Sequence, residues 1–330
     1  MFNAARGGEE LAVLEPAPAV NFAQFLTRFT GVPVAPGFCL MAGFMVALTS
    51  AAREARGVPP SEVTRRLLVR GLVLVLVDAA VLGLPRLAGG FYSFMVLTCI
   101  GVSLWLLAAV RHLPTRILLP GALAVLALHP LLDFSALPVP LRAMLHEPVR
   151  SGAFRSLYPL IPWSAFVVLG FVVGRDALRR QRPAPFWALL GGLSLLTFFA
   201  VRLPGGFGNA YPHTDPTELA FWSFAKYPPD LAFTSWALAM TFFTLAAVWL
   251  VTSAGVPRVL RPFAIFGRVP FFFYVVHFYV LGLCMALLRT KLGLLGTYAV
   301  WVALLVVMLA PCLWYDRKKR ERPNLITRYF

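Results

Sequence analysis

Charged residues are scarce in this chain. Asp, Glu, Lys and Arg make up 13% of its 330 residues, whereas 59% of the residues are hydrophobic and the mean hydropathy is +0.76. A soluble domain carries roughly 25% charged residues and does not need so much apolar sequence. The composition therefore argues against a soluble domain and favours a protein that lies in a lipid bilayer.

Cysteine is also rare, and the common catalytic motifs are absent. No CxxC pair occurs, and we expect the cysteines to be small buried side chains inside apolar stretches. They are Cys39, Cys99, Cys284 and Cys312. No Walker loop, GxSxG motif or HExxH motif occurs, and GGFGNA lies in a predicted loop without a flanking strand. The sequence therefore predicts no disulfide, no metal site and no nucleotide-binding loop.

The net charge of +16 does not indicate a nucleic-acid partner. The basic residues lie in short segments between apolar stretches, where they orient a membrane protein. Nucleic-acid binders instead concentrate positive charge on a soluble face or within a recognisable motif. We therefore expect the partner to be a lipid bilayer and not a nucleic acid.

Apolar stretches recur along the chain, and each is about 20 residues long, which is the length that crosses a bilayer as a helix. They predict an all-α fold, a polytopic transmembrane helical bundle that forms one integral-membrane domain over residues 1–330. The nine stretches lie near residues 31–51, 66–84, 91–110, 117–134, 157–174, 186–203, 230–252, 263–287 and 294–315.

The distribution of basic residues predicts the topology. The C-terminal segment 316–330 is strongly basic, so we place it in the cytoplasm. Counting back through the spans puts most Lys and Arg residues on that same side. Residues 1–30 then form an outer loop, and no signal segment precedes them. We therefore expect a further span upstream of residue 1, and nine spans with an N-terminus on the outer side are the alternative.

Ionisable residues at membrane depth are costly and are functional candidates by default. Asp78 lies in the middle of a span, in GLVLVLVDAAVLGLP, and His277 lies within FFFYVVHFYVLG. His129 and Asp133 lie near the outer end of another span, in LALHPLLD, and are candidates for binding a substrate. For each residue, a hydrogen bond inside the bundle is the alternative to a functional role.

Polar and aromatic residues also occur at the predicted outer ends of spans. With His277 they suggest a polar vestibule that opens outward and binds a substrate. They are Arg28, Trp163, Arg202, His213, Lys226 and Tyr227. The alternatives are that Arg28 and Lys226 extend to lipid headgroups and that His213 is a solvated loop residue.

The segment Lys226–Pro229 is predicted to start a helix, because proline is tolerated in the first helical turn. The free N–H groups of such a start favour an anion or a developing negative charge. Helix initiation alone also explains the prolines.

Arginines gather at two span starts on the predicted inner side, in 65–70 and in 258–268. Their forked donors suit phosphate oxygens, and membrane topology alone is the alternative. The candidates for binding a phosphorylated cofactor are Arg65, Arg66, Arg70 and Arg268.

Five strings resemble the motifs of one family. They are RFTGVPVAPGFCLMAG, RRLLVRGLVLVLVD, LYPLIPWSAFVVLGFVVGR, AKYPPDL and FGRVPFFFYVVHFY, and they occur in the family's order from about residue 22 to residue 285. They resemble bacterial proteins similar to the catalytic domain of heparan-α-glucosaminide N-acetyltransferase, within the wider transmembrane acyltransferase superfamily. KYPP and GRxPxFxYxxH together are the most specific part.

The resemblance implies a helical bundle in the bacterial inner membrane that takes an acyl group from cytosolic acetyl-CoA. It passes that group to a sugar amine or hydroxyl on the far side. The resemblance also implies that the family's first span, with its outer histidine, is missing from the chain. Asp230 stands where the family has serine, and Ser164 stands where it has glycine.

Three functions stay open. In the first, an acyl-CoA-dependent membrane acyltransferase, His277 and Asp78 are the catalytic candidates, with His277 as general base or orienting group. Acetyl-CoA is then the acyl donor, and the inner arginines hold its phosphates. The second is a small-solute or lipid transporter in which intramembrane groups relay protons. The third is an inactive family member with a scaffold role.

The sequence leaves further properties open. It does not fix the acyl chain length, the acceptor or the oligomeric state, for which a homodimer is one alternative.

Overall fold

The computed structural model describes residues 22–149, 152–211, 215–288 and 292–321. The chain divides into two compact units. The larger unit comprises residues 18–249, and the smaller unit comprises residues 250–330 together with residues 1–17. Each unit is described by itself.

Every apolar stretch that the sequence predicts to cross a membrane coincides with a helix. Two shorter apolar helices are α6 (Val96–Val110) and α7 (Thr115–Leu128), and α7 continues into the 3-10 turn η3 (His129–Leu131). Helix α4 (Pro60–Leu76) has a charged first half and continues into the π-helical segment η2 (Val77–Leu82). Within the described residues, six helices are long and apolar enough to cross a membrane: α3 (Val34–Glu54), α9 (Leu160–Ala177), α10 (Ala184–Arg202), α11 (Leu231–Thr252), α13 (Pro270–Leu288) and α14 (Leu294–Glu321).

The all-α prediction is therefore confirmed for the described chain, while the count of nine membrane spans stays a prediction. Short elements connect the long helices. They are α2 (Phe22–Thr30), α5 (Leu84–Ala88), α8 (Val139–Leu145), η4 (Leu219–Trp222), η5 (Arg258–Leu260) and α12 (Arg261–Arg268).

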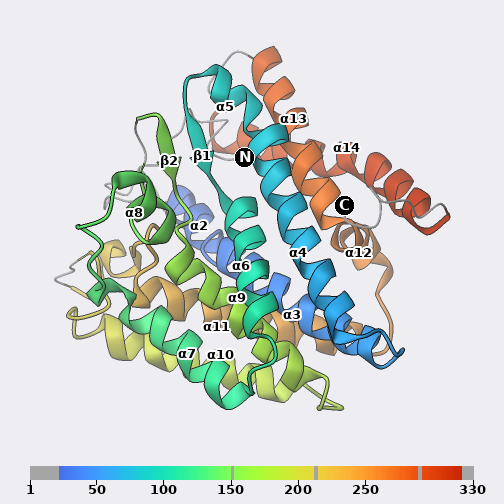
Figure 1. The fold of residues 1–330 in the computed structure, drawn as a ribbon. Coiled ribbons are helices and arrows are strands. Elements are labelled where there is room, and N and C mark those ends of the chain that lie inside the picture. The colour runs from blue at the N-terminus through green and yellow to red at the C-terminus, as the bar shows by residue number, and fades with distance from the viewer. Residues whose placement is uncertain (1–21, 150–151, 212–214, 289–291, 322–330) are drawn as a thin grey trace. The chain divides into compact units, whose positions relative to one another are not determined.

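Two short strands tie the starts of two helices together. β1 (Tyr92–Phe94) leads into α6, and β2 (Phe154–Ser156) leads towards α9. The strands are parallel, with Tyr92 opposite Phe154 and Phe94 opposite Ser156, and Figure 1 shows them extending beyond the start of α6. This pairing fixes where α6 and α9 begin.

Glycines bring α3 and α9 into backbone contact. A Cβ atom added at Gly43 of α3 would lie 1.8 Å from the carbonyl oxygen of Val167, and one at Gly170 of α9 would lie 1.8 Å from that of Leu40. Gly174, one turn further along α9, packs in the same way against Phe44. Gly170 and Gly174 form a GxxxG pattern, which lets two helices approach closely where lipid offers no hydrophobic driving force.

Helices α4 and α6 meet by the same device. A Cβ atom at Gly71 would lie 2.6 Å from the carbonyl oxygen of Gly101, and a Cβ at Gly101 would lie 2.6 Å from that of Gly71. The indole of Trp105 lies over this contact and donates to the carbonyl oxygen of Leu68 at 2.9 Å. The two glycine crossings hold the centre of the larger unit.

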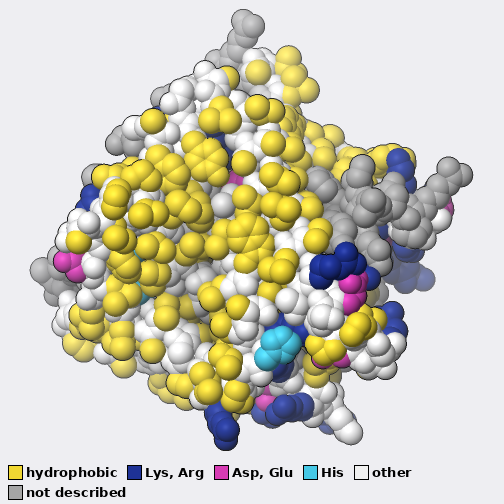
Figure 2. All heavy atoms as spheres, in the orientation of Figure 1, with side chains coloured by type: hydrophobic (Ala, Val, Ile, Leu, Met, Phe, Trp, Pro, Cys, Tyr) yellow, Lys and Arg dark blue, Asp and Glu magenta, His cyan; other side chains and the backbone are white. Residues whose placement is uncertain are grey.

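The outward faces of these helices are apolar. Leu68, Leu72 and Leu76 of α4 and Leu106 of α6 are exposed. Figure 2 shows hydrophobic side chains covering the surface over α4 and α6. A surface of this kind is stable against lipid tails and not against water.

The smaller unit has its own apolar core. Val269 follows α12 and packs with Met308, Cys312 and Tyr315 of α14. The rings of Phe272 and Tyr315 stack at 4.3 Å between centroids. These contacts join α12, α13 and α14 into one compact group.

The Gly43 contact can be tested by substitution. We expect Gly43→Ala to lower the melting temperature in detergent, because the added methyl group collides with the backbone of Val167 and overpacking costs about 1–3 kcal/mol. The matched control is Gly192→Ala on α10, where an added Cβ meets nothing within 4 Å. Equal melting temperatures for both variants would contradict the close crossing.

Candidate functional site

Two histidines from different segments meet at one end of the larger unit. His129 lies in η3 and His146 follows α8, and both side chains are buried. His129 Nδ1 lies 3.0 Å from His146 Nε2, and His129 Nε2 lies 2.9 Å from the carbonyl oxygen of Pro229. These contacts join the two neighbouring histidine segments to Pro229, which lies 100 residues from His129 in the sequence. We call this region the histidine end, defined by His129, His146, Tyr158, Tyr227 and Pro229.

Aromatic side chains fill the rest of the histidine end. The hydroxyl groups of Tyr158 and Tyr227 hydrogen bond at 2.9 Å. Trp163 of α9 is fully buried against Tyr158, with ring centroids 4.8 Å apart, and its indole N–H has no hydrogen-bond partner among the described residues. The ammonium group of Lys226 lies 4.9 Å from the centre of the Tyr227 ring. Four of the predicted substrate-binding residues therefore lie together: His129, Trp163, Lys226 and Tyr227.

Asp230 occupies the N-terminus of α11. Its carboxylate accepts the backbone N–H groups of Phe233 at 2.7 Å, Ala225 at 3.0 Å and Ala210 at 3.1 Å. The helix begins at Leu231 and not within 226–229, and the anion at its start is the chain's own carboxylate. Serine and aspartate are both good N-cap residues, so Asp230 can cap the helix as well as the serine that the resemblance leads one to expect.

Arg202 organises the long loop that follows α10. The side chain is fully buried, and its five N–H donors are all used. They bond to the side-chain oxygen of Asn209 and to four carbonyl oxygens, those of Tyr211, Ala220, Phe221 and Ser223. The residue predicted to bind substrate therefore holds the loop that precedes α11.

The other predicted residues at outer span ends are placed less centrally. Asp133 is exposed and accepts the backbone N–H and the hydroxyl of Ser135, which is an Asx turn. Arg28 belongs to α2, but its side chain lies outside the described residues, as does His213.

Asp78 is buried where α4 changes to π-helical geometry. One carboxylate oxygen accepts the backbone N–H of Thr98 at 3.0 Å and its hydroxyl at 2.7 Å. The other lies 3.7 Å from the guanidinium of Arg86 and has no hydrogen-bond partner among the described residues. π-Bulges often occur at functional sites, so the placement agrees with a functional candidate.

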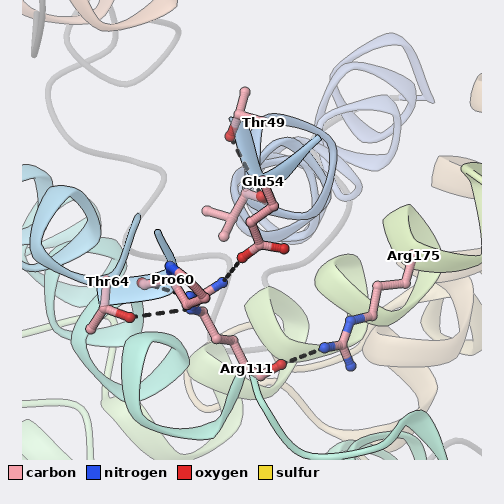
Figure 3. Close-up of polar contacts among 7 residues, drawn as sticks. Thr49, Glu54, Pro60, Thr64, Arg111 and Arg175 are labelled. Carbon is pink, nitrogen blue, oxygen red and sulfur yellow. Dashed lines mark hydrogen bonds and ion pairs between the residues drawn. The ribbon is translucent and has the colours of Figure 1, made fainter. Parts of the chain in front are cut away.

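The opposite end of the larger unit is held by arginines, and we call it the arginine end (Figure 3). Arg111, which caps α6, donates to Glu54 of α3 at 2.8 Å and to the carbonyl oxygen of Pro60 at 2.9 Å. Arg175 of α9 donates to the carbonyl oxygens of Arg111 and Leu113. These bonds tie together the ends of α3, α4, α6 and α9.

Arg65 and Arg66 of α4 share one carboxylate, that of Glu62, at 2.8 Å and 2.9 Å. The guanidinium of Arg65 is largely exposed, with 71% of its side chain accessible. Arg70 lies one turn further along and is also exposed. The three predicted phosphate-binding residues of α4 are therefore at the arginine end and reach its surface.

In the smaller unit, Arg268 pairs with Asp316 at 3.2 Å. His277 of α13 is half-buried, and its Nδ1 lies 3.1 Å from the carbonyl oxygen of Phe273 and 2.5 Å from that of Tyr274, both on its own helix. The ring of His277 stacks on that of Phe273.

Among the described residues, no group of three or more His, Cys, Asp or Glu is arranged to hold a metal ion. All four cysteines are free thiols, and Cys39, Cys99 and Cys312 are buried.

The family comparison agrees with the motif analysis. A family model described as heparan-alpha-glucosaminide N-acetyltransferase, catalytic, matches residues 11–201, more than half of the 330 residues. The chain belongs to this family. No curated protein and no solved structure matches it.

The matched region contains the glycine crossings, Asp78 and both histidines of the pair. The family's membrane character agrees with the six long apolar helices, so the chain is a membrane protein. His146 is the functional candidate that sequence reasoning missed. It lies in a loop without a motif, and its only sequence signal is that it is a second histidine close to His129.

Asp230 provides a test of helix capping. We expect Asp230→Ala to destabilise the protein by about 0.5–2 kcal/mol, because three backbone N–H groups lose their acceptor. Asp230→Ser should cost less, since a hydroxyl oxygen still accepts from Phe233. Melting temperatures in detergent measure both, with Asp133→Ala as the control for removing an exposed carboxylate. If the melting temperature of Asp230→Ala equals that of Asp133→Ala, Asp230 does not stabilise the start of α11 as a cap.

The histidine pair should make stability depend on pH. Burial lowers the pKa of His146, and the neighbouring Glu147 carboxylate only partly opposes this. The side chain of His146 therefore binds a proton more readily in the unfolded chain than in the folded protein. The stabilising effect is therefore complete above the ordinary histidine pKa of about 6.5 and is lost as the pH falls through the lowered value.

Melting temperatures measured from pH 8 to pH 5 test this dependence. We expect the wild type to lose more stability on acidification than His146→Gln does. Parallel curves for the two proteins would contradict the assignment.

Proposed function

We propose that the chain is a membrane acyltransferase that moves an acetyl or other acyl group from acyl-CoA to an amine or hydroxyl of a sugar or glycan. The proposal rests on the membership of the chain in the family, together with the two ends of the larger unit. One end carries the histidine pair, and the other carries the arginines. Helices α7 and α9 each run from one end to the other. Donor and acceptor can therefore be bound on opposite sides of one bundle.

The arginine end suits the donor. Acyl-CoA carries phosphates, and arginine forks bind phosphate oxygens through charge-assisted hydrogen bonds. Arg65, Arg66 and Arg70 reach the surface there, and Glu62 holds the first two in place. A phosphate would compete with Glu62 for them. Arg111 and Arg175 are already used in joining helices.

The chemistry requires a proton acceptor. The nitrogen or oxygen of the acceptor attacks the thioester carbonyl carbon, the C–S bond breaks, and the acceptor's proton ends on the sulfur of CoA. A histidine is suited to take that proton first, because imidazole titrates near neutral pH. His277 is one candidate, since donation from its Nδ1 to a helix carbonyl leaves Nε2 as an acceptor.

The basic residues support an orientation. The arginine end would face the cytoplasm of a bacterial inner membrane, where acyl-CoA is made, because basic residues favour that side. The histidine end would then face outward, towards the glycan acceptor. The lipid bilayer is the partner of the apolar helix faces, and the oligomeric state is open, with a homodimer as one alternative.

Label transfer tests the proposed function. Membrane vesicles that contain the protein are supplied with glucosamine and with acetyl-CoA labelled in the acetyl group. We expect label to appear in a product other than acetyl-CoA or acetate, together with free CoA, and not in vesicles that lack the protein. Glucosamine uptake that does not require acetyl-CoA, without label transfer, would instead identify a transporter.

The donor site has its own test. We expect Arg65→Ala/Arg66→Ala to raise the KM for acetyl-CoA by roughly tenfold or more, because each lost charge-assisted hydrogen bond is worth about 1.5–3 kcal/mol. The matched control is Arg155→Ala, which removes an arginine of the β2 strand that contacts the Phe91 ring. Unchanged KM values in the double variant would remove α4 from the donor site.

A further inference from the structure

The hydrogen bonds of the histidine pair fix the position of each ring proton. The carbonyl oxygen of Pro229 can only accept, so Nε2 of His129 carries a proton and donates it. Nδ1 of a neutral His129 is then an acceptor. His146 must therefore donate to it from Nε2, across 3.0 Å.

With the ring protons in these positions, one nitrogen of the pair, Nδ1 of His146, can act as a base. A neutral His146 with its proton on Nε2 has a lone pair on Nδ1. No described residue hydrogen bonds to that nitrogen, and 8% of the residue remains exposed. The ring is held by Phe134, with ring centroids 5.4 Å apart.

A base that is oriented by a second group, which is itself held, is the arrangement used by many catalytic histidines. In this protein the carbonyl group of Pro229 holds His129, and His129 in turn holds His146. The fold brings the segments that contain these three residues together. His277 differs, since the hydrogen bonds of its ring run only to carbonyl oxygens of its own helix among the described residues.

We propose that Nδ1 of His146 is the general base of acyl transfer and that His129 is the positioning residue that fixes its tautomer. The inference rests on the proposed function. As the nitrogen or oxygen of the acceptor bonds to the thioester carbon, its proton passes to Nδ1 of His146. The C–S bond breaks, and the proton then leaves His146 and ends on the sulfur of CoA.

Glutamine substitutions separate structure from catalysis. In His146→Gln, the amide N–H of the new side chain can replace Nε2 as the donor to His129, but no base remains at the position of Nδ1. We expect this variant to keep the wild-type melting temperature at pH 8 and to lose label transfer by about 10²–10⁴-fold, the usual contribution of a general base. Added imidazole should restore part of the activity of His146→Ala.

His129→Gln tests the positioning role. Its amide can still donate to Pro229, but the acceptor that fixes the proton on Nε2 of His146 is lost. We expect kcat to fall by a smaller factor than in His146→Gln, with the KM for acetyl-CoA unchanged. A change in KM with no change in kcat would overturn the positioning role.

The matched comparison is His277→Gln. A wild-type protein that transfers label, together with an active His146→Gln and an inactive His277→Gln, would overturn the inference and leave the proposed function standing. A wild-type protein that transfers no label would overturn the proposed function, and this inference with it.

Discussion

The structure depends on the backbone contact between α3 and α9. Lipid tails are as apolar as leucine, so helices in a bilayer gain little from hiding apolar surface against each other and associate through close packing instead. Gly43, Gly170 and Gly174 allow that packing, and Gly71 and Gly101 repeat it between α4 and α6. These two crossings lie at the centre of the larger unit.

Polar groups concentrate where the helices end. At one end Arg111 donates to the carboxylate of Glu54, and Arg175 donates to two carbonyl oxygens of the segment that follows α6. At the other, Asp230 caps α11 and Arg202 gathers the loop before it. Since these bonds fix the segment that contains Pro229, they also fix the acceptor that orients His129. The candidate base therefore depends on contacts between segments about 100 residues apart in the sequence.

Hydropathy predicts the helices well, because span length and composition are local properties. The burial of Asp78 and His129 also follows from their place within apolar runs. Contacts between different helices do not follow from local sequence. The pairing of Arg111 with Glu54, and of His129 with His146, depends on how helices cross, and no spacing in the sequence encodes it. The sequence is sufficient to predict the capping role of Asp230, since aspartate directly before an apolar run is a known N-cap signal.

We propose that acyl-CoA binds at the arginine end with its acyl group directed to the histidine end. Photocrosslinking tests this most directly, with an acyl-CoA that carries a diazirine at the end of a short acyl chain, followed by mass spectrometry of the labelled peptides. We expect crosslinks in the peptides around His146, Tyr158 and Tyr227, and we expect excess acetyl-CoA to prevent them. Crosslinks that avoid these peptides, or that acetyl-CoA does not displace, would contradict it.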